Sequence, residues 1–392
     1  MTTTAPLRLL CLFASAATLS AQTWQITTVD STNMVGSHSS LAVSSSGTPH
    51  IAYQDNTNKD LRYATFDGSS WNITTVDATN NKGEHTSIQL TSAGLPVIAY
   101  RDMSAGNINY VAHNGTAWQT PVVAVTGNSG SGTISLALNA SDQPSLSHYH
   151  YATTFPNGAD LKSTSYNGST WATSTVASTN DVGSTSSLAL TSGGLSRIAY
   201  LDLTTRDINY ATYNGSAWTT STITNAGASG GSWLDLALDG SGNAHLAYYY
   251  SNAFGTGELR YTYYDGSAWQ TATVDNSATN LGLYASLALD TAGQAHITYL
   301  NNTSGDLKYA LMNGTTVLST ETVDALGNVG QWTDIELDGA NGVHVSYYDY
   351  GNGDLKYAYL AAVPEPATYA LCGGALALLA TWRFRRPAAP KA

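Results

Sequence analysis

The stretch from Leu41 to Trp71 reads LAVSSSGTPHIAYQDNTNKDLRYATFDGSSW. It contains three short apolar and aromatic segments, Leu-Ala-Val, His-Ile-Ala-Tyr and Leu-Arg-Tyr-Ala, and it ends on a tryptophan that begins a fourth. Gly, Ser, Asn and Asp separate these segments, which is the pattern of short strands joined by tight turns. Asp67-Gly68 tolerates positive φ at both turn positions, so it predicts a hairpin just before Trp71.

The same four-segment unit occurs seven times, with copies about 50 residues apart. One segment begins with tryptophan in six copies and with Val317 in the remaining copy. The tryptophans are Trp24, Trp71, Trp118, Trp171, Trp218 and Trp269. The next segment, Ser-Leu-Ala-Leu or a variant, gives the start of the innermost strand at Leu41, Ile88, Leu136, Leu188, Leu236, Leu287 and Ile335.

Four antiparallel strands per copy at this period are typical of β-propeller blades. We therefore predict an all-β, seven-bladed β-propeller of four-stranded antiparallel blades over residues 22–360. The chain opens on a tryptophan strand and its last repeat ends on Asp354-Leu-Lys-Tyr-Ala-Tyr, with no such strand after it. We expect Trp24–Val29 to be the outer strand of the last blade, which closes the ring without leaving an open edge.

Charge and cysteine content exclude several classes of protein. The chain has 15 Lys and Arg against 27 Asp and Glu, a net charge of −12. A phosphate-binding surface needs clustered cations, which the repeats lack, so nucleic acid is not expected as a partner. Cys11 and Cys372 both lie outside the repeats, so neither an intrachain disulfide nor a cysteine-based metal site is expected within them.

Both ends of the chain carry apolar segments that do not belong to the repeats. Residues 1–21 contain Arg8 and then an apolar run, which predicts a secretory signal peptide cleaved near Ala21. Residues 361–366 are expected to form a linker with a Pro-Glu-Pro motif, 367–386 a transmembrane helix with a basic cluster, and 387–392 a cytoplasmic tail. The basic cluster predicts that the propeller lies outside the cell.

The order of motifs in this C-terminal region resembles the PEP-CTERM sorting signal. The matching residues are Pro364, Glu365 and Pro366 before the apolar stretch, and Arg383, Arg385 and Arg386 after it. Proteins with this signal are exported by Gram-negative bacteria and processed by an exosortase, often alongside exopolysaccharide production. The resemblance implies exosortase as a partner, an inner-membrane intermediate held by the C-terminal helix, and a final place at the cell surface or outside the cell.

The repeats themselves resemble those of secreted bacterial propellers and, distantly, sialidase-type repeats. An Asp-box would read Ser-x-Asp-x-Gly-x-Thr-Trp, whereas Phe66-Asp-Gly-Ser-Ser-Trp71 lacks that spacing. Sialidases need three arginines that converge on a carboxylate, and no three arginines of the repeats occupy equivalent positions. These arginines are Arg62, Arg101, Arg197, Arg206 and Arg260. Sialidase chemistry is therefore not expected.

Departures from the sevenfold symmetry indicate where a site could lie. Three residues before each innermost-strand Leu or Ile stand His38, His85, Thr133, Thr185, Trp233, Tyr284 and Trp332. In ring order, blades five, six, seven, one and two carry rings, which predicts a contiguous aromatic crescent near the channel mouth. Asp235 and Asp334 occupy positions that are Ser elsewhere. Rings beside carboxylates can stack on a sugar and accept its hydroxyl hydrogen bonds, although such rings can also simply fill gaps between blades.

Three other sets of residues suggest metal ligands. His148 and His150 alternate on one strand and point to one face, but no third ligand can be assigned. A second set, His50, His245, His296 and His344, shares one position in successive blades, which lie too far apart for one metal, so we interpret these histidines as structural. Loops such as Asp55–Asp60 suggest calcium sites, yet their spacing matches no EF-hand and their Asp and Asn suit turns.

These observations favour an exported surface or matrix propeller that binds a glycan or another surface partner without catalysis. The predicted ligand-binding residues are the crescent with Asp235 and Asp334; no catalytic residue, metal site or cofactor is predicted, with calcium kept as an alternative. A second hypothesis is a glycan-active hydrolase or lyase that uses Asp235, Asp334 and nearby histidines. A third is a scaffold without a small ligand.

Overall fold

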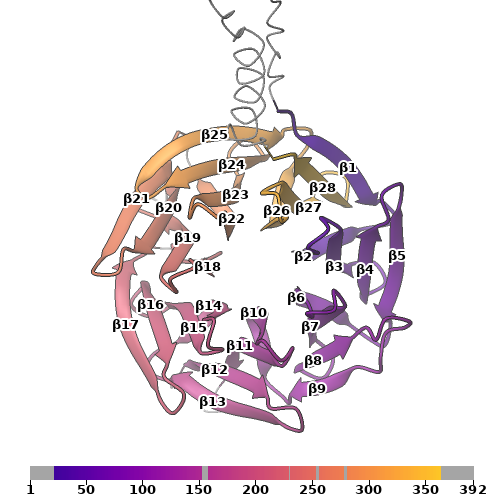
Figure 1. Ribbon diagram of the computed structural model, residues 1–392, viewed down its shortest axis with the longest axis horizontal. Helices are drawn as coiled ribbons and strands as arrows, with labels where there is room; N and C mark the ends of the chain where they lie inside the picture. The colour runs from indigo at the N-terminus through magenta and orange to yellow at the C-terminus, as the bar shows by residue number, and fades with distance from the viewer. Residues whose placement is uncertain (1–21, 152–157, 229, 253–255, 278–279, 363–392) are drawn as a thin grey trace, which may run out of the picture.

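The computed structural model describes residues 22–151, 158–228, 230–252, 256–277 and 280–362. The predicted signal peptide, the Pro-Glu-Pro motif, the C-terminal helix and the arginine cluster lie outside these residues. Over the described ranges, no helix is long and apolar enough to span a bilayer. The described chain forms seven four-stranded sheets arranged in a ring, which confirms the predicted seven-bladed propeller (Figure 1).

The strands of each blade follow one another from the channel outwards. Blade 1 comprises β2 (Val35–Val43), β3 (Pro49–Asp55), β4 (Asp60–Phe66) and β5 (Trp71–Asp77). Blade 2 comprises β6 (Lys82–Leu90), β7 (Pro96–Asp102), β8 (Asn107–Ala112) and β9 (Val122–Val125). Blade 3 comprises β10 (Ser129–Leu138), β11 (Pro144–Tyr151), β12 (Ala159–Tyr166) and β13 (Trp171–Ala177). Blade 4 comprises β14 (Val182–Leu190), β15 (Ser196–Asp202), β16 (Asp207–Tyr213) and β17 (Trp218–Asn225).

The remaining blades repeat this order, with one exception at the ring closure. Blade 5 comprises β18 (Asp235–Leu238), β19 (Ala244–Ser251), β20 (Gly257–Tyr264) and β21 (Trp269–Asp275). Blade 6 comprises β22 (Leu281–Leu289), β23 (Ala295–Asn301), β24 (Asp306–Asn313) and β25 (Thr316–Asp324). Blade 7 comprises β26 (Val329–Leu337), β27 (Val343–Asp349), β28 (Asp354–Leu360) and β1 (Gln25–Asp30).

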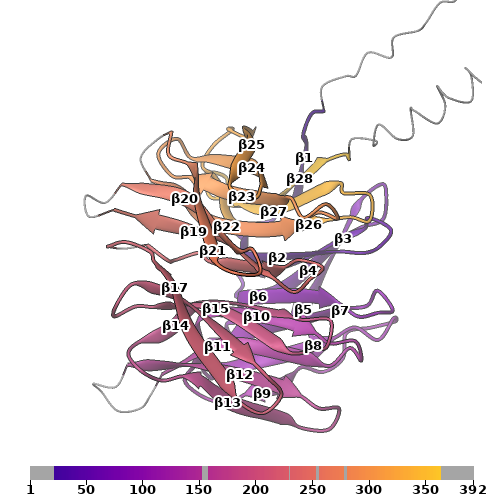
Figure 2. The same cartoon turned by 60° about the vertical axis from the view of Figure 1, so that its left-hand side comes forward.

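The first strand of the chain closes the ring. β1 pairs antiparallel with β28, with Thr27 opposite Tyr357, and it thereby becomes the outer strand of blade 7. Figure 2 shows β1 and β28 side by side at the edge of the ring. The predicted closure is confirmed, and it leaves the last blade with the same four strands as the others.

The repeated tryptophan joins neighbouring blades. The Trp71 ring lies 5.1 Å from the Tyr357 ring of the preceding blade, in an edge-to-face arrangement. Trp24 makes the equivalent contact with Tyr309 at 5.4 Å, so the ring closure reproduces an ordinary junction. Such aromatic pairs add about 0.5–1.5 kcal/mol beyond the area that they bury. At these junctions the outer-strand tryptophan of one blade therefore packs on the third-strand tyrosine of the preceding blade.

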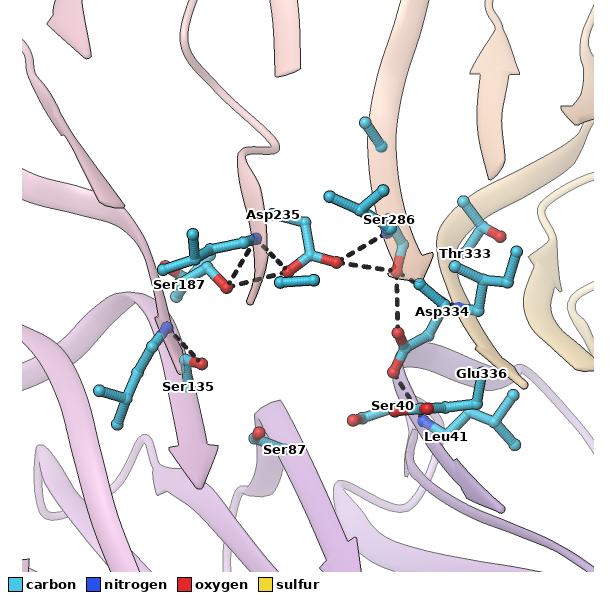
Figure 3. A pocket seen from close by; sticks show the side chains of 18 of the residues that line it. Ser40, Leu41, Ser87, Ser135, Ser187, Asp235, Ser286, Thr333, Asp334 and Glu336 are labelled. Atoms are coloured by element: carbon cyan, nitrogen blue, oxygen red, sulfur yellow. Dashed lines mark hydrogen bonds between the residues drawn. The ribbon is translucent and has the colours of Figure 1, made fainter. Parts of the chain in front are cut away.

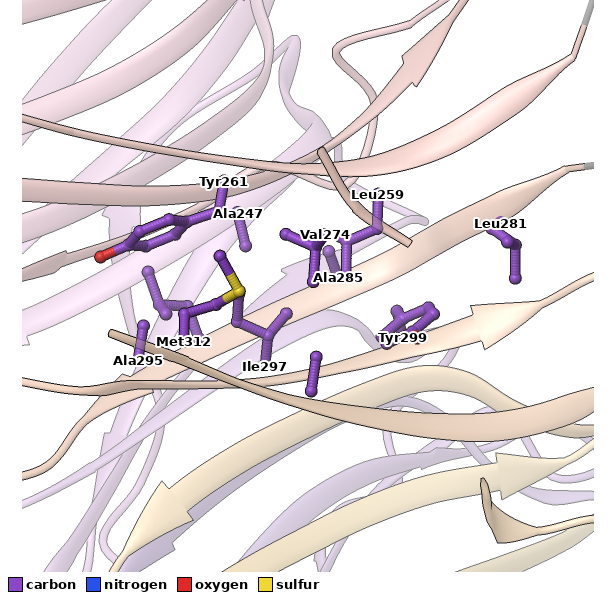
Figure 4. Packing of buried hydrophobic residues seen from close by; sticks show 12 residues of the cluster. Ala247, Leu259, Tyr261, Val274, Leu281, Ala285, Ala295, Ile297, Tyr299 and Met312 are labelled. Atoms are coloured by element: carbon purple, nitrogen blue, oxygen red, sulfur yellow. The ribbon is translucent and has the colours of Figure 1, made fainter. Parts of the chain in front are cut away.

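Apolar cores lie between the blades rather than at the ring centre. Figure 4 shows the core between blades 5 and 6, where Leu259 and Tyr261 pack against Ile297 and Met312. At this junction, the buried Tyr299 hydroxyl also donates to Asp275 at 2.6 Å. The centre of the ring is consequently left to the inner strands, whose polar and aromatic residues form the site described next.

Candidate functional site

Five blades carry an aromatic residue with positive φ near the start of the inner strand, at a register shift of that strand in blades 1, 2, 6 and 7 and just before β18 in blade 5. In blade 1, the register of β2 against β3 shifts between Ser37 and Ser40, and His38 lies at this shift with a φ of 54°. The equivalent residues of blades 2, 5, 6 and 7 also have positive φ: His85 49°, Trp233 54°, Tyr284 53° and Trp332 47°. Bulky residues rarely adopt this conformation, and a backbone held this way costs about 1–3 kcal/mol per residue.

The five rings form one unbroken series. Centroid distances are 4.8 Å from Trp233 to Tyr284, 5.3 Å from Tyr284 to Trp332, 4.9 Å from Trp332 to His38, and 4.7 Å from His38 to His85. The five rings are therefore contiguous, as the sequence predicts. Its role in ligand binding stays a prediction.

The crescent ends where blades 3 and 4 replace the ring by threonine. Thr133 donates through its hydroxyl to the carbonyl oxygen of Ser186 at 2.9 Å and accepts from the Ser186 N–H at 2.7 Å. Thr133 and Thr185 are also not among the residues with positive φ. On this side of the ring, the Thr133 hydroxyl therefore contacts the Ser186 backbone without any ring stacking.

A central cavity of about 480 Å³ runs between the inner strands of all seven blades. Trp233, Tyr284 and Trp332 line it, whereas His38 and His85 continue the crescent without lining this cavity. Its volume lies in the range of about 300–1,000 Å³ that small-ligand sites usually have. The three large rings are thus the members of the crescent that a molecule in the cavity would touch.

Two residues beyond the crescent position, a ring of hydrogen bonds links every blade to the next. In each blade the side chain before the inner-strand Leu or Ile accepts the backbone N–H of the corresponding residue in the following blade, at 2.7–3.3 Å. We call this the serine–aspartate belt; its acceptors are Ser40, Ser87, Ser135, Ser187, Asp235, Ser286 and Asp334. The sequence comparison found these positions but not this shared structural role.

Asp235 uses both carboxylate oxygens within the belt (Figure 3). Its Oδ1 accepts from the Ser187 hydroxyl at 2.9 Å and from the Leu236 N–H at 2.8 Å. Its Oδ2 accepts from the Leu287 N–H at 2.8 Å and lies 3.2 Å from Ser286 Oγ. Burial nevertheless raises the pKa of Asp235 above its ordinary value.

Asp334 closes the belt between blades 7 and 1. Its Oδ2 accepts from the Leu41 N–H at 2.7 Å, and its Oδ1 lies 3.0 Å from Ser286 Oγ. Burial, together with the nearby Asp235 charge, raises the pKa of Asp334 to about 6. The two aspartates, whose separation the sequence left open, are therefore connected through the hydroxyl of blade 6 (Figure 3).

Glu336 is a cavity residue that the sequence comparison did not single out. It lines the cavity two residues beyond Asp334, and no hydrogen bond joins its carboxyl group to any residue in the described ranges. Burial first, and then the charges of Asp334 and Asp235, raises its pKa to about 8. Comparing this position across the repeats reveals Gln89 in blade 2 and Ala in the other five blades, so the same symmetry test could have found it.

The two crescent histidines are neutral at ordinary pH. Burial lowers the pKa of His85 to about 4, and burial with the neighbouring His85 lowers that of His38 well below its ordinary value. The buried His38 Nδ1 has no hydrogen-bond partner within the described chain. These rings therefore contribute apolar surface and polar edges rather than positive charge.

The histidines of blade 3 are held by hydroxyl groups. His148 Nε2 lies 2.9 Å from Thr164 Oγ1, and His150 Nδ1 lies 2.7 Å from Ser129 Oγ. Both line a smaller pocket between blades 2 and 3. Across the part of the chain that the structure describes, no three His, Cys, Asp or Glu residues are grouped as a metal site.

The other candidate ligands have structural partners. His344 Nδ1 lies 2.5 Å from the Tyr357 hydroxyl of its own blade, and His50, His245 and His296 make the same contact with Tyr63, Tyr261 and Tyr309. This geometry agrees with the structural interpretation of the four. In the loop considered for calcium, Asp55 Oδ1 accepts the N–H groups of Thr57 and Asn58, as a turn-forming aspartate does.

Solved structures with the same fold include glycan-active proteins. An ulvan lyase of polysaccharide lyase family PL25 aligns with a TM-score of 0.59 and 13% identity, over 86% of this chain and 94% of that chain. Its complex with the glycan -[GlcA(1-4)Rha3S]- aligns with a TM-score of 0.57, at 12% identity over the same shares of the two chains. A Dyadobacter fermentans protein of unknown function aligns with a TM-score of 0.54 and 11% identity, over 86% and 98%. A leech intramolecular trans-sialidase reaches 0.49 at 10% identity, over 87% and 94%.

No family model and no curated protein sequence matches the chain. At these identities the likeness to the ulvan lyase and to the Dyadobacter fermentans protein shows the propeller fold alone. By fold the chain is therefore a seven-bladed propeller, and among the described residues that line its central cavity the aromatic rings come from blades 5, 6 and 7.

Proposed function

We propose that this protein is an exported propeller that binds a glycan at the aromatic crescent, without catalysis. The observation that carries the proposal is the unbroken series of rings at the cavity mouth, each held by a strained backbone. The equivalent Thr133 and Thr185 of blades 3 and 4 lack positive φ, so the contact between neighbouring blades does not itself require it. Strain that recurs at one mouth is the pattern of a site whose geometry is fixed for a ligand.

The fold likeness supports a glycan as the ligand class. The propeller of the ulvan lyase has been solved with a bound oligosaccharide, and it covers most of this chain. Sugar rings present apolar faces that stack on Trp and Tyr, with hydroxyl groups at their edges for polar partners. The tilted rings of Trp233, Tyr284 and Trp332 offer such faces next to cavity carboxyl groups.

A glycan-active lyase or hydrolase is the second candidate. It is favoured by the raised pKa values of Asp334 and Glu336, which keep a proton available near neutral pH. Against it, the oxygens of Asp235 and Asp334 already accept backbone N–H groups of neighbouring blades. A carboxylate that holds blades together is poorly placed to transfer a proton to a substrate. We therefore favour binding over turnover, with a purely structural scaffold as the third reading.

The proposed location follows from the two ends of the sequence. The signal-like segment 1–21 and the PEP-CTERM-like tail support export, an inner-membrane intermediate and processing by an exosortase. A matrix or surface protein of this kind would meet exopolysaccharide or another surface glycan. Labelling and fractionation of the native cells, with and without the Pro364–Pro366 motif, tests this part separately.

The binding proposal is tested with the double variant Trp233→Ala/Trp332→Ala. We expect loss of retention on a glycan array or a polysaccharide column, with an unchanged far-ultraviolet circular dichroism spectrum. Tyr151→Ala is the matched control, because this aromatic residue is 50% exposed at the end of β11, in a blade without a crescent ring. Glycan retention by the double variant would contradict the proposal. Turnover of a bound glycan by the wild-type protein, lost in Asp334→Asn, would favour the lyase or hydrolase instead.

A further inference from the structure

The central cavity carries acidic side chains and no basic ones. Asp235, Asp334 and Glu336 line it, and the described residues around it include no Lys, Arg or His. Two of the acids are engaged in the serine–aspartate belt, but the Glu336 carboxyl group has no hydrogen-bonding partner in the described chain. An unpaired carboxylate in a confined cavity is unfavourable unless it meets a proton or a cation.

The position of Glu336 is unusual among the repeats. The equivalent residue is alanine in five blades and Gln89 in blade 2, so neither blade packing nor the belt requires a carboxyl group there. Burial and the two aspartates raise the pKa of Glu336 to about 8, because no positive group among the described cavity residues compensates its charge. A positive group beside it would reverse this effect.

The crescent above the cavity suits a cationic sugar. The Tyr284 ring is tilted by 47° to Trp233 and by 56° to Trp332, so the three rings do not form a flat stack. The faces of Trp and Tyr attract ammonium groups as well as sugar rings. Glu336 lies four residues along β26 from Trp332, a span of roughly 13 Å, which is within reach of a short chain held at the mouth.

We propose that the ligand of the crescent carries free ammonium groups, as in a chain of deacetylated amino sugars, and that Glu336 selects for them. This inference rests on the proposed glycan-binding function and adds the charge class of the ligand. Uronic acids and sulfated sugars are disfavoured, because their negative charge cannot compensate carboxyl groups that have no basic neighbour in the described part of the cavity.

Two oligosaccharides that differ only in N-acetylation test the inference. Glucosamine oligomers are expected to bind the purified protein at least about tenfold more tightly than N-acetylglucosamine oligomers of equal length, by calorimetry at pH 7. Glu336→Gln should remove this preference. Glu321→Gln makes the same change on the outer strand β25 and should keep it. Gln89→Glu adds a carboxyl group to the cavity and should increase the preference for glucosamine oligomers. This variant tests the inference if Glu336→Gln does not fold.

Other outcomes separate this inference from the proposed function. N-acetylated oligomers or polyuronate could bind as tightly as glucosamine oligomers, or more tightly. If that binding is lost in Trp233→Ala/Trp332→Ala, the charge preference is overturned but the glycan site is kept. Absence of binding to every oligosaccharide overturns both. Oligolysine is the last probe. If it binds more tightly than glucosamine oligomers, and still binds the Trp233→Ala/Trp332→Ala variant, the partner is a basic polypeptide and the inference is overturned.

Discussion

Asp235 and Asp334, from blades 5 and 7, lie on either side of the one hydroxyl group of Ser286. Ser286 Oγ is 3.2 Å from Asp235 Oδ2 and 3.0 Å from Asp334 Oδ1. A hydroxyl group has a single hydrogen and can donate to only one of them. We infer that a proton on Asp334 completes the second contact, so that Asp334 donates to Ser286 and Ser286 donates to Asp235.

This arrangement predicts opposite effects for the same substitution at the two aspartates. In Asp334→Asn, the amide oxygen can accept the Leu41 N–H while the amide nitrogen donates to Ser286, so all contacts remain. In Asp235→Asn, both positions face backbone N–H donors, so the amide nitrogen must oppose one of them. An unsatisfied buried group of this kind costs about 1–3 kcal/mol.

Urea denaturation at pH 7 measures the difference between these two variants. We expect Asp334→Asn to match or exceed the unfolding free energy of the wild-type protein, and Asp235→Asn to fall below it by about 1–3 kcal/mol. Equal losses in both variants would contradict the shared proton.

The same proton makes stability depend on pH. The folded-state pKa of Asp334 is raised from an ordinary 3.8 to about 6. The stability that it contributes is therefore complete below about pH 4 and is lost as the pH rises through 6. The change is about 1–3 kcal/mol. We expect the unfolding free energy of the wild-type protein relative to Asp334→Asn to fall between pH 4 and pH 7, and a constant difference would refute the assignment.

The ring and its closure could be predicted because each depends on repetition. Seven copies of one hairpin pattern fix the number of blades, and a tryptophan strand without its own blade must pair with the last. The contiguity of the crescent could be predicted for the same reason, since equivalent positions in neighbouring blades become neighbours in space. Here the rings of Trp332 and His38 meet across the junction of the last and first blades. At the same junction, the Ser39 hydroxyl donates to the carbonyl oxygen of Trp332, 293 positions away in the chain.

The belt could not be predicted, because it depends on how far each inner strand is offset from the next. Repetition identifies Asp235 and Asp334 as replacements of serine, but not that the serine accepts a backbone N–H from the following blade. Once that bond is known, aspartate is a longer acceptor in the same role. Glu336 differs from the two aspartates because it lies past the inner-strand Ile335, where the sequence marks it only by its departure from the alanine of five other blades.

Gly282 sets how closely blade 6 approaches blade 5. It has a φ of 91°, and a Cβ atom added there would lie 2.8 Å from Leu259 Cα and 3.0 Å from Leu259 N. Gly282→Ala should therefore destabilise the protein by about 2–4 kcal/mol. Gly266 has a similar φ of 93° but nothing within 4 Å of the added atom, so Gly266→Ala isolates the backbone strain. Thermal denaturation should show a clearly larger loss for Gly282→Ala, and equal losses would show that the close approach is unimportant.

The strain in the crescent can be measured at Trp332. Its φ of 47° is unfavourable for any residue with a Cβ atom and neutral for glycine. Both Trp332→Ala and Trp332→Gly remove the ring and its contacts with His38 and Tyr284, so they differ only in the backbone. Elsewhere in a strand, glycine is less stable than alanine by about 0.5–1 kcal/mol. Here we expect Trp332→Gly to be more stable than Trp332→Ala by about 1 kcal/mol, with both equally unable to retain glycan.

The control is the pair Thr133→Ala and Thr133→Gly. Thr133 occupies the equivalent position in blade 3, and its φ is not positive. Thr133→Gly should be less stable than Thr133→Ala, which reverses the order found at Trp332. The midpoints of urea denaturation of the four variants give the order of stability of alanine and glycine at each position. If alanine is the more stable replacement at both positions, the crescent is not strained, and its rings are explained by packing between blades. If the order reverses, the protein holds these rings at the cavity mouth against its own backbone preference, which is expected where the rings serve a ligand.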